Sequence, residues 1–142
     1  MQVKAIDIRA LDHVVLRVED LDRSLHFYCD VLGCREERRL EELGLVQLRA
    51  GASLIDLVDV RSPLGEKGGV APGPQGRNMD HFALELAQFD ETRLREHLRA
   101  HSVEPSEVAE RYGAGGYGPS MYVLDPDGNT VELKGPPVRQ LD

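Results

Sequence analysis

The sequence predicts an α+β fold in which two βαβββ modules pair their sheets into a cupped, mixed sheet. Three observations predict this fold. An Asp-His dipeptide opens an apolar strand pattern at residues 12–13 and again at 80–81, 68 residues later. An aspartate stands nine residues after each histidine, and a helical pattern follows it. Each half then closes on a strand pattern with one acidic residue between apolar ones, at 55–57 and 131–133.

The repeat also predicts the domain organisation. The chain has 142 residues, of which 41% are apolar, enough for one domain or two very small ones. We expect a single domain over residues 1–142, because neither module is long enough to bury its concave sheet alone. Module one is predicted at 8–60, a linker at 61–78 and module two at 79–135. The glycines and prolines of the linker predict a flexible connection, and the alternative is a lid folded over a pocket.

Module one begins with an alternating, valine-rich strand at 11–18. Asp20 or Asp22 can cap the N-terminus of the helix that follows, and Gly33 supplies the left-handed residue that ends it. The apolar stripe of this helix consists of Leu21, Leu25, Tyr28 and Leu32. Three strands follow, at 35–40, 44–50 and 53–60, with the first of them at an edge.

Module two repeats this order with different residues. A strand is predicted at 80–86, and Asp90 caps a helix that carries Leu94 and Leu98. Phe89, just before the cap, fits a hydrophobic staple against Leu94. Three strands follow, at 107–111, 120–124 and 129–134. The last two are joined by Asp-Pro-Asp-Gly, a strong turn signal because proline presets φ and glycine accepts a positive φ.

Composition and charge exclude several functional classes. Acidic residues outnumber basic ones 25 to 17, giving a formal net charge of −8, which disfavours nucleic-acid binding. The basic cluster at 35–39 is interleaved with glutamates and predicts a self-compensating, solvated surface. No apolar run approaches the roughly 18 residues of a membrane span, and the first twelve residues lack the apolar core of a signal peptide. Cys29 and Cys34 lack a CxxC spacing. We expect a cytoplasmic protein that acts on a small molecule.

Two histidines and two carboxylates form a candidate metal site. His13 and His81 lie on the first strand of each module, and Asp56 and Glu132 on the last. If the concave sheets pair, these four side chains converge. Mixed nitrogen and oxygen ligands suit Zn, Ni, Mn, Fe or Co and leave positions open for substrate. The alternative for each histidine is a hydrogen bond within the core. Asp56 is the weaker ligand because its side chain is one methylene shorter than that of glutamate.

Three stretches of the chain resemble the vicinal oxygen chelate superfamily. They are the strand and helix at 13–33, the strand at 79–84 and the closing strand, turn and strand at 122–133. The resemblance covers residues 8–135, and the closing stretch is its most specific part. Members include glyoxalase I, fosfomycin-resistance thiol transferases, extradiol dioxygenases, methylmalonyl-CoA epimerases and bleomycin-binding proteins. The resemblance implies a glyoxalase-like fold of paired βαβββ modules and a homodimer.

The resemblance also implies roles for individual residues. His13, His81 and Glu132 fall on the three recurrent metal ligands of the superfamily, and Asp56 falls where glyoxalase I has a further glutamate ligand. Arg17 matches the arginine that binds the glutathione carboxylate in glyoxalase I. Two positions depart from the glyoxalase I pattern. Val60 stands where that enzyme usually has a glutathione-binding asparagine, and residue 56 is an aspartate rather than a glutamate.

Other members of the superfamily match in part. Ser120 and Tyr122 match a Ser-Phe-Tyr stretch of fosfomycin-resistance proteins, but Val15 replaces their characteristic threonine and their longer basic tail is missing beyond Asp142. Extradiol dioxygenases have a tyrosine near Tyr122 but generally need a further catalytic histidine and a longer chain. The remaining histidines are predicted on helices, where we interpret them as surface or packing residues: His26, His97 and His101.

A glycine-rich stretch at 113–118 precedes a strand rather than a helix, so it does not fit a nucleotide loop. We expect a hairpin near the mouth of the site, with Tyr117 touching substrate.

The expected function is that of a divalent-metal-dependent lyase or isomerase of glyoxalase type. Its substrate would be a small oxygenated molecule, either free or conjugated to a thiol. The metal would chelate substrate oxygens, Glu132 or Asp56 would move the proton, and Arg17 and Tyr122 would bind substrate. The alternatives are a fosfomycin-type thiol transferase and a non-catalytic antibiotic- or metabolite-binding protein of bleomycin-resistance type.

Overall fold

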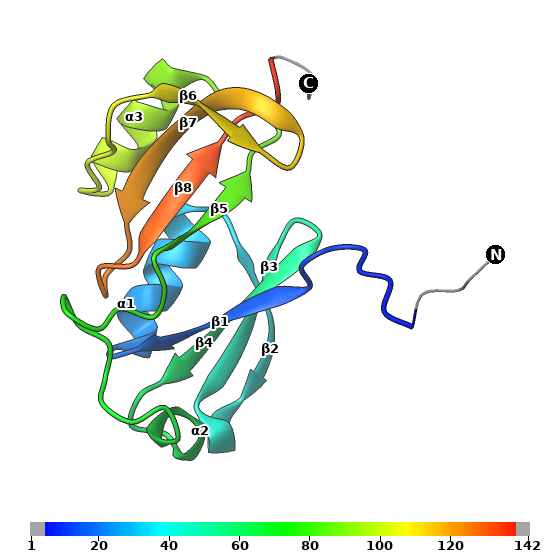
Figure 1. The fold of residues 1–142 in the computed structure, drawn as a ribbon. Helices are drawn as coiled ribbons and strands as arrows, with labels where there is room; N and C mark the ends of the chain where they lie inside the picture. The colour runs from blue at the N-terminus through cyan, green and yellow to red at the C-terminus, as the bar shows by residue number, and fades with distance from the viewer. Residues whose placement is uncertain (1–4, 139–142) are drawn as a thin grey trace.

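The computed structural model describes residues 5–138 and contains two βαβββ modules, one above the other in Figure 1. Each module forms a four-stranded mixed sheet. The predicted α+β fold class is therefore confirmed. The predicted domain also includes residues 1–4 and 139–142, which lie outside the described residues.

The first sheet has the strand order β1-β4-β3-β2. Its elements are β1 (His13–Val18), α1 (Leu21–Leu25), a π-helical segment η1 (His26–Val31), β2 (Arg35–Leu40), a 3₁₀ turn η2 (Glu41–Leu43), β3 (Leu45–Ala50) and β4 (Ser53–Asp59). β1 runs parallel to β4, and the other neighbours are antiparallel. As predicted, β2 is an edge strand. Nearly all its side chains are exposed, and Arg39 pairs with Glu36 while Arg49 on β3 pairs with Glu37.

The second sheet repeats this topology, with the order β5-β8-β7-β6 and β5 parallel to β8. Its elements are β5 (His81–Glu85), α3 (Glu91–Ala100), β6 (Ala109–Gly113), β7 (Gly116–Leu124) and β8 (Thr130–Lys134). β6 and β7 form a tight hairpin in which Gly113 pairs with Gly116. The predicted hairpin in the glycine-rich stretch is present, and β7 begins four residues earlier than the sequence pattern indicated.

The first helix differs from the prediction in its geometry. Asp20 is the N-cap, and its carboxylate accepts a hydrogen bond from the Arg23 amide. After Leu25 the chain continues as a π-helix, in which the Leu32 amide bonds to the Phe27 carbonyl five residues back. The fully buried side chains are Ser24, Phe27, Tyr28 and Val31. Of the predicted stripe only Tyr28 is fully buried, because the wider turn changes which residues face the core. Leu21, Leu25 and Leu32 pack at its margin.

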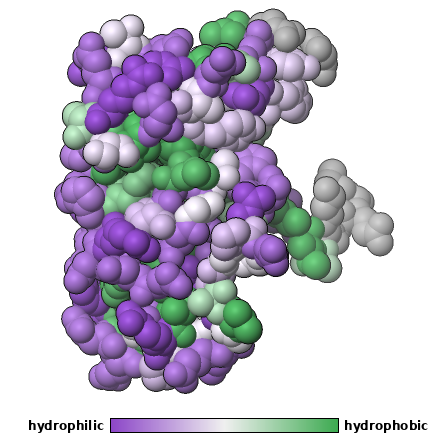
Figure 2. All heavy atoms as spheres, turned by 90° about the vertical axis from the view of Figure 1, so that its left-hand side faces the viewer, coloured by the Kyte–Doolittle hydropathy of each residue, from purple (hydrophilic) through white to green (hydrophobic). Residues whose placement is uncertain are grey.

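The hydrophobic core is one cluster to which both modules contribute. Alternation along the strands directs Leu16 and Leu57 of the first sheet, and Met121 and Val131 of the second, into it. Seen from the left-hand side of Figure 1, the surface is mostly hydrophilic, and hydrophobic side chains gather between its upper and lower parts (Figure 2). The opposite, concave faces of the sheets carry the polar residues discussed below.

The turn between β7 and β8 fastens module two to the first helix of module one. The Tyr28 hydroxyl donates to Asp125 Oδ2 at 2.7 Å, and Asp125 also accepts from the backbone and side-chain amides of Asn129. Asp127 accepts from the Glu19 amide at 3.1 Å and from the Ser24 hydroxyl at 3.3 Å. These bonds between distant parts of the sequence make the predicted turn an interface between the modules.

The linker contains a short helix, α2 (Pro63–Glu66), capped by the Ser62 hydroxyl. At the C-terminal end of the linker, the Asn78 side chain bonds to the backbone N–H and carbonyl of Arg17 and to the Asn129 side chain. The linker is thus tied to β1 and to the start of β8.

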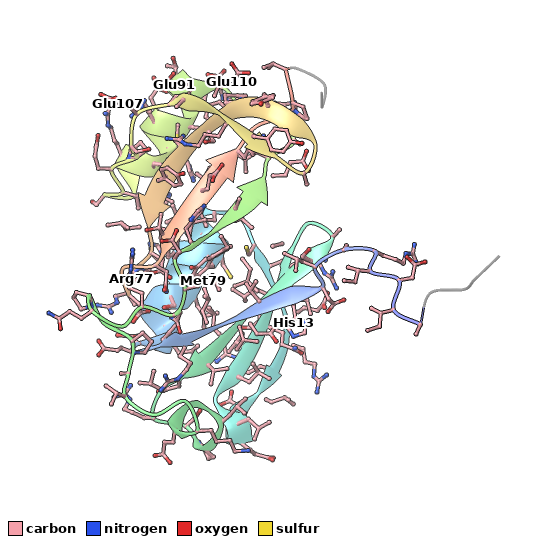
Figure 3. All side chains as sticks on the ribbon, in the orientation of Figure 1. His13, Arg77, Met79, Glu91, Glu107 and Glu110 are labelled. Atoms are coloured by element: carbon pink, nitrogen blue, oxygen red, sulfur yellow. The ribbon has the colours of Figure 1, made fainter. Side chains whose placement is uncertain are left out.

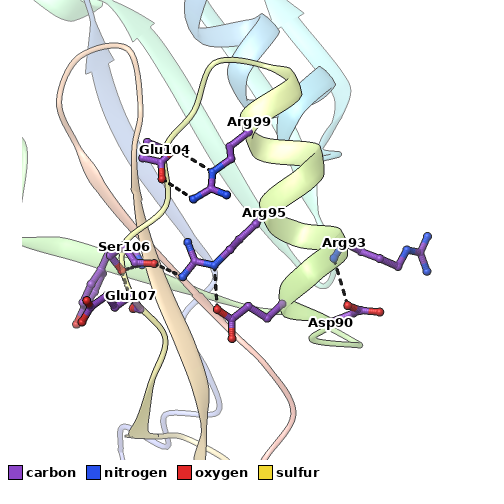
Figure 4. A network of polar contacts seen from close by, with 9 residues as sticks. Asp90, Arg93, Arg95, Arg99, Glu104, Ser106 and Glu107 are labelled. Atoms are coloured by element: carbon purple, nitrogen blue, oxygen red, sulfur yellow. Dashed lines mark hydrogen bonds and ion pairs between the residues drawn. The ribbon is translucent and has the colours of Figure 1, made fainter.

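The longest helix, α3, lies on the outside of the second sheet. Asp90 caps it, as predicted, and Arg95 bonds to Glu91 in the first turn of the helix. Two arginines also bond to the chain that follows, Arg95 to the Ser106 carbonyl and Arg99 to Glu104 (Figure 4). Leu98 is its buried residue. Among residues 5–138, no helix is long and apolar enough to cross a membrane.

Candidate metal and substrate site

One histidine and one carboxylate lie close together on the concave face of the first sheet. His13 is on β1, and Asp56 is on the neighbouring strand β4, in register with Val15. Asp56 is only 4% exposed. Its Oδ2 accepts a hydrogen bond from Gln47 Nε2 at 3.1 Å, and its Oδ1 is buried without a hydrogen-bond partner. An orphaned carboxylate oxygen beside an imidazole is an unusual and costly arrangement unless a cation binds there.

The second sheet holds the equivalent pair. His81 Nε2 lies 3.4 Å from Glu132 Oε1, and Glu132 is 6% exposed. The His81 ring meets the Tyr122 ring edge-on, with 5.7 Å between centroids. Tyr122 is in register with Glu132, just as Gln47 is in register with Asp56.

Each histidine is oriented by the aspartate that precedes it. The Nδ1 atom of His13 donates to Asp12 at 2.8 Å, and that of His81 to Asp80 at 2.6 Å. The bond with Asp12 raises the pKa of His13, and the charge of Asp56 adds to the rise while burial opposes it. The bond with His81 lowers the pKa of Asp80. Both Asp-His dipeptides are visible in the sequence, but the repeat alone does not indicate that the aspartates orient the histidines.

This chemistry fits a divalent transition metal. A carboxylate on Nδ1 fixes the tautomer that leaves Nε2 free as a ligand, as in many metal sites. Imidazole nitrogen with carboxylate oxygen suits Zn, Mn, Fe, Co or Ni. The residues that could hold the ion are His13 and Asp56 in one module, and His81 and Glu132 in the other.

The chain brings these residues together as two pairs. Within the part of the chain that the structure describes, no three histidine, cysteine or acidic side chains converge on one metal position. His13 lies on the lower module in Figure 3, and Met79 lies where the linker leads into β5 of the upper one. A pocket of about 420 Å³ is lined by both histidines and by apolar residues of β1, β4 and β5. The two carboxylates belong to the concave faces of separate sheets.

Arg17 is bound to the linker. Its guanidinium donates to the carbonyls of Gly65, Gly68, Gly69 and Val70 at 2.7–3.1 Å. Four of its five N–H groups are used in this way. The sequence could not indicate this contact, because it depends on where the linker returns to the sheet. The predicted contact of Arg17 with substrate stays a prediction, with one N–H group left to make it.

Tyr122 and Ser120 face the concave side of the second sheet, and Arg111 lies over them. The Arg111 guanidinium carbon is 4.4 Å from the centre of the Tyr122 ring, and Nη1 bonds to the Ser120 hydroxyl at 2.7 Å. Strand alternation places Tyr117 on the opposite face of β7, where its ring contacts that of Tyr112. Sequence reasoning missed Arg111, although alternation along β6 could have placed it on this face.

A second pocket, of about 310 Å³, opens beside Glu132. It is lined by His81, Glu85, Glu132, Lys134 and the β6–β7 hairpin. Lys134 is 8% exposed, and its Nζ donates to the Gly116 carbonyl at 2.9 Å. The sequence pattern put Lys134 on the same face as Glu132, yet nothing in it distinguished a buried lysine from one that ends a strand in solvent.

The other histidines and the cysteines lie on or beside the helices. His26 bonds to Asp30, and His97 Nε2 lies 2.7 Å from the Val31 carbonyl, as helix-surface and helix-packing residues do. Both cysteines are free thiols. Burial raises the pKa of Cys34 to about 11 and also raises that of Cys29, so neither is an activated nucleophile.

Comparison with known proteins identifies the family of the chain. The chain matches the family model described as Glyoxalase/Bleomycin resistance protein/Dioxygenase superfamily over residues 10–133. It is 28% identical to the glyoxalase domain-containing protein RDO1 of Mycosarcoma maydis over 139 residues, 93% of this chain and 71% of that protein. It is 34% identical to the lactoylglutathione lyase GLX1 of Arabidopsis thaliana over 135 residues, 89% of this chain. This match spans 44% of that longer protein.

The fold is also similar to solved structures. The integron cassette protein VCH_CASS1 from the mobile metagenome of V. cholerae superimposes with a TM-score of 0.70 and 27% identity, over 93% of this chain and 98% of that one. The two repeated modules and the family match over residues 10–133 show that the chain belongs to the Glyoxalase/Bleomycin resistance protein/Dioxygenase superfamily, whose vicinal oxygen chelate motifs its sequence resembles.

Proposed function

We propose that the protein is a divalent-metal-dependent lyase or isomerase of glyoxalase type that acts on a small oxygenated substrate. One observation carries the proposal. Both modules hold an Asp–His pair beside a buried carboxylate: one oxygen of Asp56 has no partner, and Glu132 Oε1 lies 3.4 Å from His81 Nε2. Each pair supplies one nitrogen and one oxygen donor, and the aspartate on Nδ1 orients the imidazole.

We further propose that the metal site is shared between two copies of the chain. His13 and Asp56 of one copy would face His81 and Glu132 of the other. Two features support a second copy. Residues 5–12 project from the body as an extended arm, on which Ile6, Ile8 and Leu11 are each more than three-quarters exposed (Figures 1 and 2). Val15, between His13 and Arg17 on the concave face, is 47% exposed. Apolar side chains so placed suit an interface.

The side chains of the site would divide the work as follows. His13, His81 and the two carboxylates would hold the metal, which supplies Lewis-acid activation of adjacent substrate oxygens when bound. Glu132 or Asp56 would accept a proton from the substrate and return it to the neighbouring carbon. Gln47 fixes one oxygen of Asp56 and leaves the other without a hydrogen-bond partner. Tyr122 limits the position of the His81 ring.

Elemental analysis of the purified chain tests the proposal. We expect about one divalent ion per chain in the wild-type protein, and loss of most of it in His13→Ala and in His81→Ala alike. His26→Ala is the matched control, because this histidine bonds to an aspartate on the helix surface and lies outside the site. Full metal retention in His13→Ala or in His81→Ala would contradict the proposal. A lactoylglutathione lyase assay of the loaded protein then tests the reaction class.

A further inference from the structure

The second sheet carries a cationic position that the proposed metal chemistry does not use. We propose that Lys134, assisted by Arg111, binds an oxyanion of the substrate in the pocket beside His81 and Glu132. The substrate class is then a small oxygenated acid, with a carboxylate, phosphonate or phosphate near its chelating oxygens. This inference rests on the proposed function for the identity of the site, and it is tested by a separate readout.

The burial of Lys134 is the first argument. The residue is 8% exposed, and its recorded polar contact is a neutral carbonyl, that of Gly116. Among residues 5–138 it forms no ion pair. Burying an ammonium group beside a single carbonyl is costly, and a bound anion offsets that cost. The ammonium has two further N–H groups to donate.

The direction of the Lys134 side chain is the second argument. The lysine extends across β7 to the β6–β7 hairpin, and its register partner on β5, Glu85, also reaches this hairpin, where a Cβ at Gly115 would lie 4.0 Å from Glu85 Oε1. Gly113 and Gly118 make room for it. A Cβ at Gly113 would lie 2.7 Å from the lysine Cε, and one at Gly118 would lie 3.2 Å from Nζ. The hairpin is therefore built to hold an extended lysine at the pocket.

Module one provides the third argument. The residue two beyond the carboxylate is Lys134 in β8 and Val58 in β4, and their register partners are Ser120 and Leu45. Val58 is 2% exposed, so the same architecture accepts an aliphatic side chain at this place. Because the fold does not require a lysine there, the lysine points to ligand binding.

Arg111 supplies the second cation. It lies on β6 opposite Gly118, its Nη1 bonds to the carbonyl and hydroxyl of Ser120, and its plane rests on Tyr122. Within residues 5–138, its recorded hydrogen bonds use Nη1 alone, so Nε and Nη2 can bind a ligand. The two acids of the pocket lie on β5 and β8, and Lys134 reaches the β6–β7 hairpin. Arg111 does not line this pocket itself but is the neighbour on β6 of the lining residue Tyr112. A ligand can place its chelating oxygens at one side and its charge at the other.

The dimensions agree with a small acid. The pocket of about 310 Å³ is within the range of small-molecule sites. Glu132 and Lys134 are two residues apart on one strand, so their Cα atoms are separated by roughly 7 Å. A guanidinium and an ammonium on one face are the groups that proteins use for carboxylates and phosphates.

Titration with two probes tests the inference. The full chain, freed of metal with a chelator, is titrated with inorganic phosphate and with acetate, and ¹H–¹⁵N chemical shifts are followed. We expect shifts in the 111–118 hairpin and around Lys134. Lys134→Met removes the charge of the side chain and nearly keeps its length. We expect this change to weaken binding of the preferred oxyanion about ten- to a hundredfold. Tighter phosphate binding identifies a phosphate or phosphonate substrate, and tighter acetate binding a carboxylate.

Lys67→Met is the matched control, because it removes the same charge from an exposed position of the linker. Wild-type affinity in folded Lys134→Met, an equal loss in Lys67→Met, or no binding of either probe to the wild type would overturn the inference. If Lys134→Met does not fold, Arg111→Gln replaces it, and unchanged affinity there would overturn the inference. Manganese binding by the same wild-type sample is measured separately. Absence of manganese binding would overturn the proposed function, whereas the affinity for phosphate and acetate alone decides the role of Lys134.

Discussion

The two modules share one backbone plan and use it differently. In each, a histidine follows an aspartate on the first strand and a carboxylate lies on the last. Four residues after the histidine, on the same face of the strand, module one has Arg17, which anchors the linker. Module two has Glu85 at the equivalent position, where it lines a pocket. Under the proposed function, the shared positions would hold the metal, and the differing positions would separate a supporting module from a ligand-binding one.

The carboxylates themselves show the same division. Asp56 is held by the neutral Gln47 side chain and keeps one oxygen without a partner. Glu132 lies beside His81 and among Tyr122, Arg111 and Lys134 of the second sheet. A repeat that duplicates ligands therefore need not duplicate the substrate contacts, and comparing equivalent positions identifies which residues the fold does not need.

The largest expected effect comes from the carboxylate of module two. Glu132→Gln keeps the size of the side chain but removes its charge and its basicity. We expect turnover in a lactoylglutathione lyase assay, or with whichever substrate is identified, to fall about 10²–10⁴-fold, together with weaker metal retention. Asp56→Asn is the equivalent change in module one and should cost less, because the shorter aspartate is the weaker ligand. Unchanged turnover and metal content in Glu132→Gln would refute the assignment.

The β7–β8 turn of module two bonds to the first helix of module one, and Asp125→Ala measures what this contact contributes. The change leaves the buried Tyr28 hydroxyl and the Asn129 amides without their acceptor. We expect a loss of about 3–5 kcal/mol in the free energy of unfolding, measured by urea denaturation. Asp30→Ala removes an exposed carboxylate and should cost under about 1 kcal/mol. Equal losses in the two variants would mean that the turn does not fasten the modules.

Substituting the aspartates that orient the histidines gives a smaller effect. It tests how similar the two half-sites are, namely His13 with Asp56 in module one and His81 with Glu132 in module two. Asp12 and Asp80 are exposed, at 90% and 84% of their side-chain areas. We expect Asp12→Ala and Asp80→Ala each to weaken manganese binding about tenfold, at the low end for residues that orient metal ligands. Isothermal titration of the purified variants measures this. A loss in only one variant would show that the half-sites contribute unequally.

Asp127 gives the smallest effect and one that depends on pH. Burial raises the pKa of its carboxyl, and the charge of Asp125 adds to the rise, while bonds from Glu19 and Ser24 oppose it. A raised pKa in the folded state means that the stabilising contribution is present below the unfolded pKa and is lost as pH rises through the folded one. Asp127→Asn should therefore equal or exceed the wild type at pH 7, by up to about 0.5 kcal/mol, and lose this advantage below pH 4. Thermal unfolding of both proteins at pH 7 and below pH 4 measures this difference. A wild type that is more stable than Asp127→Asn at pH 7 would contradict the assignment.

The features that repeat in the sequence were the ones that could be predicted. The Asp-His dipeptides and the acidic closing strands located His13, His81, Asp56 and Glu132 on their strands, and turn chemistry located the β7–β8 connection. The π-helical segment at 26–31 was not predictable from apolar spacing, because a wider turn changes which residues face the core.

Long-range contacts were likewise hidden. The carbonyls that Arg17 binds and the hairpin that covers Lys134 are distant in the sequence, so only the folded chain shows that both side chains donate to backbone carbonyls. The sequence pattern of a strand does not show whether a charged residue in it is buried or exposed.

A mixing experiment tests most directly whether half-sites of two chains form one metal site. His13→Ala removes a proposed ligand of the module-one half-site only, and Glu132→Gln removes one of the module-two half-site only. Equal amounts of the two variants are unfolded, mixed, refolded and assayed for bound metal. A shared site predicts that each variant alone is depleted of metal, whereas the mixture recovers about one quarter of the wild-type content, since half the dimers are mixed and one of their two sites is intact. Metal content in the mixture no higher than the average of the two variants would contradict the shared site.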